Sequence, residues 1–149
     1  VFSQLGKNTL IIDADMTESP IMKLFGLNIS AGLSNCLAQR TTTEESIVKI
    51  DGFDDLSVLF AGSKPPNPQE LLSKTEFSAL LNKLVAQYDI ILVNSAAIGE
   101  RSDASLISTR CKDVIVIAKK NMTQAKGVKK FKHEMLDAGV NIVGGVLSE

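Results

Sequence analysis

Five apolar runs of strand length recur along the chain. They are nearly continuous and do not alternate between apolar and polar residues, which is typical of strands in a parallel sheet that is covered on both faces. The pattern therefore predicts five buried strands, over residues 9–15, 56–61, 90–95, 113–118 and 141–147.

A strong helical pattern precedes the third run. Apolar residues from Phe77 to Tyr88 recur at spacings of three and four residues, which places them on one side of an amphipathic helix. Ser73 followed three residues later by Glu76 predicts a capping box at its start. Tyr88 is the only tyrosine of the chain, and its position on this buried stripe predicts a structural role.

A second amphipathic helix is predicted between the last two runs. It carries Val128, Phe131 and Met135 on its apolar side, and it should end at Gly139. The single histidine, His133, falls among the lysines of this helix and is interpreted as a surface residue. Weaker patterns predict further helices over residues 103–111, 21–25, 33–38 and 44–49.

Strands that alternate with helices predict an α/β fold. The expected architecture is one doubly wound domain over residues 1–149, with a mostly parallel sheet and helices on both faces. In such folds, binding sites lie beyond the carboxyl ends of the strands. The stretch 63–70 contains Pro65, Pro66 and Pro68 directly after a predicted strand, which indicates an extended loop.

The composition argues against several classes of function, namely nucleic-acid binding, zinc or histidine-rich metal sites and membrane spanning. The 149 residues carry a formal net charge of −1, which argues against binding nucleic acid through a concentrated positive field. Cys36 and Cys111 lack the paired spacing of a zinc site and are predicted to be buried, reduced thiols. A single histidine excludes a histidine-rich metal site. No apolar run is long enough to span a membrane.

The dipeptide Gly6-Lys7 looks like the end of a phosphate loop, G-x-x-x-x-G-K-[ST]. However, Val1 stands where the first glycine is required, and Asn8 stands where a hydroxyl residue is required. The dipeptide also leads into a strand, whereas a phosphate loop follows one. We therefore interpret Gly6 as the end of a helix and Lys7 as a turn residue, with no phosphate loop in these 149 residues.

Two carboxylates close the first predicted strand. Asp13 and Asp15 occupy alternate positions, so both side chains are expected on the same side of the strand. Carboxylates held together in this way suit a hydrated magnesium ion. A strand-end pair that caps the following turn would have the same sequence, so the spacing leaves both interpretations open.

Several segments together resemble the cytoplasmic kinase domain of bacterial tyrosine kinases (BY-kinases). These regulators of capsule and exopolysaccharide chain length are related to partitioning and cell-division-site ATPases. GKNTLIIDADM is similar to the second Walker motif of the family, and YDIILVNSAAI lies where the family has its Walker B strand. KLFGL and GLSNCLAQ resemble the segments that follow the Asp-x-Asp strand. LFAGSKPPNPQELL is the most specific match, because it separates BY-kinases from the partitioning ATPases.

The resemblance implies a P-loop NTPase-like fold that binds ATP and magnesium and transfers the γ-phosphoryl group to tyrosine. It implies magnesium ligation by Asp13 and Asp15, catalytic positions at these two residues and at Asn94, and a further cofactor contact from Ser95. It also implies a membrane-embedded activator as partner, self-association in a ring, and a cytoplasmic location at the inner face of the membrane.

Two departures from the family pattern and the start of the chain change this expectation. Thr17 stands where the family has an arginine, and Asn94 replaces the Walker B aspartate. An amide brings no negative charge and cannot act as a general base. In the family, the phosphate loop and its strand would precede Val1, so we interpret the chain as a fragment that is incomplete at its amino terminus.

Two functions from different classes remain open. The first is a tyrosine-kinase-like ATPase domain of polysaccharide synthesis and export, catalytically impaired in this chain. The second is a non-catalytic module that keeps the kinase fold for interaction or regulation. The changes at Thr17 and Asn94 favour the second function for this chain, and the family resemblance favours the first.

Overall fold

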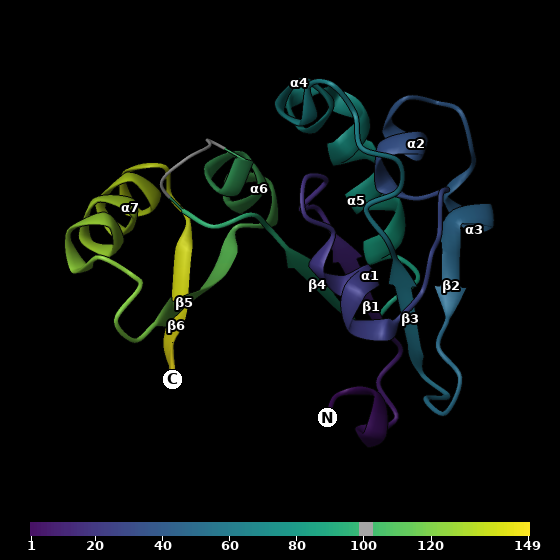
Figure 1. The fold of residues 1–149 in the computed structure, drawn as a ribbon, viewed down its shortest axis with the longest axis horizontal. Coiled ribbons are helices and arrows are strands. Elements are labelled where there is room, and N and C mark those ends of the chain that lie inside the picture. Colours follow the sequence, from purple (N-terminus) through teal and green to yellow (C-terminus); the bar gives the residue numbers. More distant parts are fainter. Residues whose placement is uncertain (99–102) are drawn as a thin grey trace. The chain divides into compact units, whose positions relative to one another are not determined.

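The computed structural model describes residues 1–98 and 103–149 (Figure 1). The chain divides into two compact units, Val1–Ala96 and Ala97–Glu149. Each unit combines helices with parallel strands, which confirms the predicted α/β class and its mostly parallel strand pairing. Among the described residues, no helix has the length and apolar character needed to cross a membrane.

The first unit is built on a four-stranded sheet. Its strands are β1 (Thr9–Asp13), β2 (Ile47–Lys49), β3 (Leu56–Leu59) and β4 (Ile90–Asn94), in the order β2-β3-β1-β4. β1 pairs in parallel with both β3 and β4, whereas β2 pairs antiparallel with β3. The three parallel strands are the first three predicted runs, each slightly shorter than expected.

The predicted amphipathic helix before β4 is α5 (Thr75–Val85). It buries four apolar side chains of the predicted stripe: Phe77, Leu80, Leu81 and Leu84. The stripe ends earlier than expected, because the helix ends at Val85 and that side chain is 67 % exposed. Tyr88 therefore lies beyond the helix and is only half-buried, so its predicted place on a buried stripe is wrong.

Four short helices complete the first unit. They are α1 (Pro20–Phe25), α2 (Leu33–Leu37), α3 (Thr43–Ser46) and α4 (Pro68–Ser73). The first two confirm predicted helices. The helix predicted over residues 44–49 is wrong in its second half, because α3 ends at Ser46 and the β-branched residues Ile47 and Val48 pair with β3.

The capping box predicted at Ser73 is also wrong. Pro68 begins α4 inside the predicted loop, so Ser73 is the last residue of a helix, and its hydroxyl donates to the Glu70 carbonyl at 2.8 Å. A capping box occurs instead at the start of α3. There the Glu45 amide donates to the Thr42 hydroxyl, and the Thr42 amide donates to the Glu45 carboxylate.

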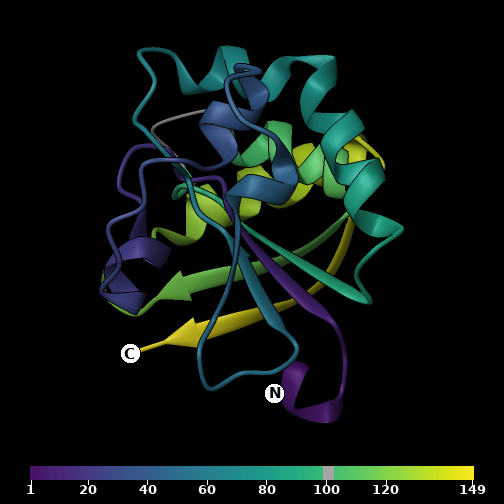
Figure 2. The ribbon, with the colours of Figure 1, turned by 90° about the vertical axis from the view of Figure 1, so that its right-hand side faces the viewer.

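The amino-terminal residues form one short helical turn, which agrees with the prediction that a helix ends at Gly6. A single 3-10 turn, Ser3–Leu5, ends at Gly6 with a φ of 71°, and Lys7 is exposed before β1 begins. In Figures 1 and 2 this turn lies at one end of the first unit, and α2 and α4 lie at the other end. The carboxyl ends of the parallel strands therefore face α2 and α4.

A close backbone approach joins α2 to the end of β3. The Leu33 amide donates to the Phe60 carbonyl at 2.7 Å, directly after Gly32. A Cβ on Gly32 would overlap this carbonyl oxygen and the backbone of Gly62, which itself has a φ of 79°. Glycine is therefore required at both positions. Gly32 is required because of the close contact, and Gly62 because of both its close contacts and its backbone conformation.

The second unit pairs two parallel strands with two helices. The strands are β5 (Asp113–Lys119) and β6 (Asn141–Ser148), and the helices are α6 (Asp103–Cys111) and α7 (Ala125–Asp137). Figure 2 shows both helices on the same side of the strand pair. The small core of this unit consists of Ala104, Phe131, Met135 and Val140, packed with Val114, Val116 and Ile142.

The helices of this unit match the predictions closely. α6 has the predicted bounds, and α7 ends at Asp137, where Gly139 follows with a φ of 72°. The Gly139 amide donates to the Leu136 carbonyl at 3.0 Å, which closes the last turn. His133 is exposed, as predicted.

The expectation that both faces of every strand are covered is wrong for β5 and β6. Residues along β5 alternate between half-buried and exposed, because within this unit both helices cover the same face. The outward face is apolar and carries Ile115, Ile117, Val143 and Val146, each more than half exposed.

Both cysteines are free thiols, and both are half-buried, so the predicted burial is only partly correct. Burial raises the pKa of the Cys111 thiol to about 11. At neutral pH this side chain is therefore a protonated and weakly reactive thiol.

Candidate functional site

The register of the sheet brings Asp13 and Asn94 side by side. Asp13 is the last residue of β1, Asn94 is the last residue of β4, and the two are direct partners in the parallel pairing. The backbone ladder continues past them, since the Ala14 amide donates to the Asn94 carbonyl at 2.8 Å. The two side chains therefore have little freedom to separate.

The Asp13 carboxylate is fully buried, with 0 % of the residue exposed. Its Oδ1 accepts hydrogen bonds from Asn94 Nδ2 at 3.0 Å and from the Asp15 amide at 3.3 Å. Its Oδ2 accepts a hydrogen bond from the Ile21 amide in α1 at 3.2 Å. Burial raises the pKa of Asp13 above its ordinary value, and the hydrogen bonds limit this rise.

Asp15 lies beyond β1 and has different partners. Because the strand ends at Asp13, the alternation that was expected to align both carboxylates on one side of a strand does not reach Asp15. Its Oδ1 accepts hydrogen bonds from the amides of Thr17 and Glu18, each at 3.1 Å. These contacts close the turn that leads into α1, as the turn-capping alternative describes.

Asn94 and Ser95 complete the set of predicted site residues. An ionised carboxylate can only accept hydrogen bonds, so the Asn94 side chain directs its NH₂ group at Asp13. Ser95 is half-buried, and its hydroxyl donates to the Ala96 carbonyl at 3.3 Å. The structure thus joins Asp13 directly to Asn94 and, through a backbone amide, to Asp15, whereas Ser95 bonds within its own segment.

These groups do not fit a magnesium ion in the conformation that they adopt. Magnesium requires an octahedral shell of oxygen ligands and retains several waters. Asp13 is closed off from solvent, both of its oxygens accept from N–H donors, and Asn94 presents its NH₂ end. No cluster of three or more acidic, histidine or cysteine side chains suited to a metal occurs in residues 1–98 and 103–149. The arrangement is a hydrogen-bonded closure of the strand ends.

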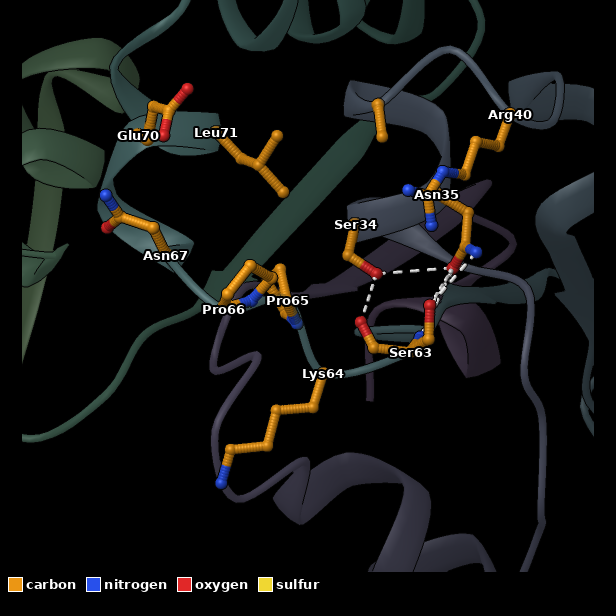
Figure 3. A pocket seen from close by; sticks show the side chains of 11 residues that line it. Ser34, Asn35, Arg40, Ser63, Lys64, Pro65, Pro66, Asn67, Glu70 and Leu71 are labelled. Carbon is orange, nitrogen blue, oxygen red and sulfur yellow. Dashed lines mark hydrogen bonds between the residues drawn. The ribbon is translucent and has the colours of Figure 1, made fainter.

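A second polar network, which the sequence patterns did not indicate, lies at the end of β3 (Figure 3). Asn35 Oδ1 accepts hydrogen bonds from the amides of Gly32 and Ser63, each at 3.2 Å, and Asn35 Nδ2 donates to Ser63 Oγ at 3.1 Å. Ser34 Oγ donates to the Ser63 carbonyl at 2.6 Å. Asn35 is the third residue of α2, from which a side chain can reach back to the start of its helix. The spacing of Asn35 from Gly32 is the signal that could have indicated this role.

The proline-rich string forms one wall of a pocket of about 240 Å³ beside this network. Figure 3 shows Pro65 and Pro66 on the loop between the network and α4, with Leu71 on the α4 side of the pocket. Charged groups at its margin come from Arg40, Lys64 and Glu70. The most family-specific string therefore lies at the edge of the sheet where β1 and β4 also end.

Comparison with known proteins identifies relatives along the whole chain, although no family model matches it. CapB from Staphylococcus aureus is 34 % identical over 148 residues, which are 99 % of this chain and 64 % of CapB. The tyrosine-protein kinase ptk from Acinetobacter johnsonii is 30 % identical over 149 residues, which are 100 % of this chain and 20 % of ptk. The chain thus spans less than two thirds of the length of these relatives.

Solved structures extend the comparison to the fold. The kinase domain of the Escherichia coli tyrosine kinase ETK has a TM-score of 0.90 at 29 % identity, covering 99 % of this chain and 57 % of that one. The septum site-determining protein MinD from Pyrococcus horikoshii, complexed with Mg-ADP, has a TM-score of 0.79 at 19 % identity. The aligned region covers 98 % of this chain and 59 % of the MinD chain. At this identity the likeness shows the fold alone. The resemblance inferred from the motifs is confirmed: the chain is a homologue of the bacterial tyrosine-protein kinases, with the P-loop NTPase-like fold that they share with MinD.

Proposed function

We propose that this chain is part of a tyrosine-kinase-like ATPase of capsule or exopolysaccharide synthesis, and that its catalytic activity is impaired at Asn94. The homology to tyrosine-protein kinases supports the family role. The hydrogen bond of 3.0 Å between Asn94 Nδ2 and Asp13 Oδ1 is the observation that carries the impairment.

The chemistry of phosphoryl transfer explains why this contact matters. The reaction needs ligands for the magnesium ion that neutralises the phosphates, and a group that orients or deprotonates the attacking hydroxyl. Asn94 is neutral, and its NH₂ group is directed at Asp13, so it adds no negative charge beside a magnesium ion and cannot deprotonate the hydroxyl. The Asp15 carboxylate is engaged by the turn that follows it. ATP and magnesium remain the expected cofactors of the family, and this chain supplies the fold around their position.

A polysaccharide-export kinase also has partners and a location in the cell. In this role the protein acts at the cytoplasmic face of the membrane, with a membrane-embedded chain-length protein as its activator. Self-association is part of the same role. Nucleic acid is not an expected partner, in keeping with the net charge of −1.

A phosphoryl-transfer assay tests whether these 149 residues have any kinase activity. We expect the 149-residue chain, incubated with γ-labelled ATP, magnesium and a tyrosine-containing peptide, to form no labelled phosphotyrosine above background. The added peptide is needed because the chain itself has a single tyrosine, Tyr88. The ETK kinase domain, assayed in parallel, is the positive control. Labelled phosphotyrosine that disappears in Asp13→Ala would show that the site is active and that the impairment does not exist.

The second function, a non-catalytic interaction module, is favoured by the same hydrogen bond. The hydrogen bond between Asn94 and Asp13 satisfies the buried carboxylate without a ligand. The fold is then stable without nucleotide or metal, and a non-catalytic interaction module needs only a stable fold. The two functions differ in their response to Asn94→Asp in a form of the protein that binds ATP. An impaired kinase gains turnover from the restored carboxylate, whereas turnover of a module stays at background.

A further inference from the structure

We propose that the Asn94 amide takes the place of a divalent cation as the partner of the Asp13 carboxylate, so that this edge of the sheet is complete without magnesium. The inference concerns the stability of the site and its response to metal. It stands independently of the proposed function, because it requires neither nucleotide binding nor kinase activity.

The position of Asn94 in the sheet holds its side chain beside Asp13. The two residues are register partners at the ends of β4 and β1, and one backbone hydrogen bond, from Ala14 to Asn94, continues beyond them. Partners on adjacent strands keep side chains of the same face within contact distance. Asp13 is fully buried, so water cannot replace the Asn94 amide as its hydrogen-bond donor.

The remaining donors around Asp13 are fixed in the backbone. The amides of Asp15 and Ile21 occupy the other accepted positions, at 3.3 and 3.2 Å. Asn94 Nδ2 is therefore the only side-chain donor that the hydrogen bonds of the described residues give to this carboxylate. It can therefore be removed by changing a side chain, without altering the backbone.

An aspartate at position 94 would replace the hydrogen-bond donor of Asp13 with a second carboxylate. A second carboxylate would then face the buried Asp13 at hydrogen-bond distance, and the two could not both stay ionised without a cation between them. The natural amide removes the repulsion and donates a hydrogen bond as well. A neutral residue at position 94 thus makes the folded strand ends independent of cations, and a charged residue makes them dependent.

Exchange of the pair tests the inference. We would compare the thermal unfolding midpoints of four proteins, in a chelator and in millimolar magnesium chloride: the natural chain, Asn94→Asp, Asp13→Asn, and the exchanged double variant Asp13→Asn/Asn94→Asp. Asn28→Asp adds the same charge at an exposed position and controls for nonspecific effects. Calorimetric titration with magnesium chloride would measure binding directly.

The expected unfolding midpoints distinguish the effect of the amide hydrogen bond from the effect of an added charge. In chelator, Asn94→Asp should unfold about 5 °C or more below the natural chain, because a repulsion replaces a buried hydrogen bond. Magnesium should raise the midpoint of Asn94→Asp alone, by at least half of that loss. The exchanged variant again has one amide and one carboxylate, so it should unfold well above Asn94→Asp in chelator and show no response to magnesium.

Two results would overturn the inference. One is a magnesium-induced rise, or a calorimetric heat of binding, in the natural chain as large as in Asn94→Asp. The other is an exchanged variant no more stable in chelator than Asn94→Asp. If Asn94→Asp cannot be obtained folded, the natural chain and the exchanged variant still decide the matter, since both must fold and both must ignore magnesium. Neither result bears on the phosphoryl-transfer assay, so failure of this inference and failure of the proposed function are distinguishable.

Discussion

Gly32→Ala should lower the free energy of unfolding of the first unit by about 3 kcal/mol. A Cβ at this position would overlap the Phe60 carbonyl oxygen and would lie within 2.8 Å of the Gly62 Cα. These are backbone atoms, so relief requires α2 to move away from the end of β3. That movement would lengthen the Leu33 to Phe60 hydrogen bond, which is 2.7 Å in the structure.

Gly52→Ala is the matched control for this substitution. Gly52 has a φ of 82°, yet a Cβ there would meet no atom within 4 Å. Its replacement should therefore cost only the strain of a left-handed backbone, about 1 kcal/mol. Urea unfolding followed by circular dichroism measures both losses, and equal losses for Gly32→Ala and Gly52→Ala would show that the close approach of α2 to β3 contributes nothing.

Asp13→Ala should have the second large effect, a loss of about 3 kcal/mol in the free energy of unfolding. Removal of the carboxylate leaves three donors without an acceptor, namely Asn94 Nδ2 and the amides of Asp15 and Ile21. The site is buried, so water does not replace the lost acceptor. The cost is therefore the full desolvation of unpaired polar groups.

Asp15→Ala provides the comparison for Asp13→Ala. Asp15 also accepts two backbone hydrogen bonds, but it is half-exposed, so the freed amides of Thr17 and Glu18 can bind water. We expect a loss of about 1 kcal/mol. Urea unfolding of the two variants shows whether the buried hydrogen bonds of Asp13 contribute more stability than the exposed turn hydrogen bonds of Asp15. A loss for Asp13→Ala no greater than for Asp15→Ala would contradict the description of the site. Asp13→Asn and Asp15→Asn would give the same comparison if an alanine variant does not fold.

The parallel strands could be predicted because their signal is local. Continuous apolar runs of strand length are enough to place β1, β3 and β4 within two residues of their observed ends. β2 was not predicted because it forms only by pairing with β3. A three-residue segment directly after a helix has no local pattern that indicates its pairing partner. The false capping box at Ser73 has a local cause, since Pro68 starts a separate helix just upstream.

The candidate site could be predicted only in part. Two polar residues at the carboxyl ends of neighbouring parallel strands must lie close together, and this reasoning brings Asp13 and Asn94 to one place. It could not show that β1 stops at Asp13 and releases Asp15 into a turn, because both outcomes have the same sequence. The Asn35 network joins residues 28 positions apart, and no periodicity links them.

Calorimetric titration of the 149-residue chain with ATP and magnesium tests the central claim most directly. The sequence has no phosphate loop, and the Asp13 carboxylate is closed by Asn94, so we expect no measurable heat of binding. The ETK kinase domain, titrated under the same conditions, provides the reference for binding. Micromolar affinity that is abolished by Asp13→Ala or Asp15→Ala would contradict the claim.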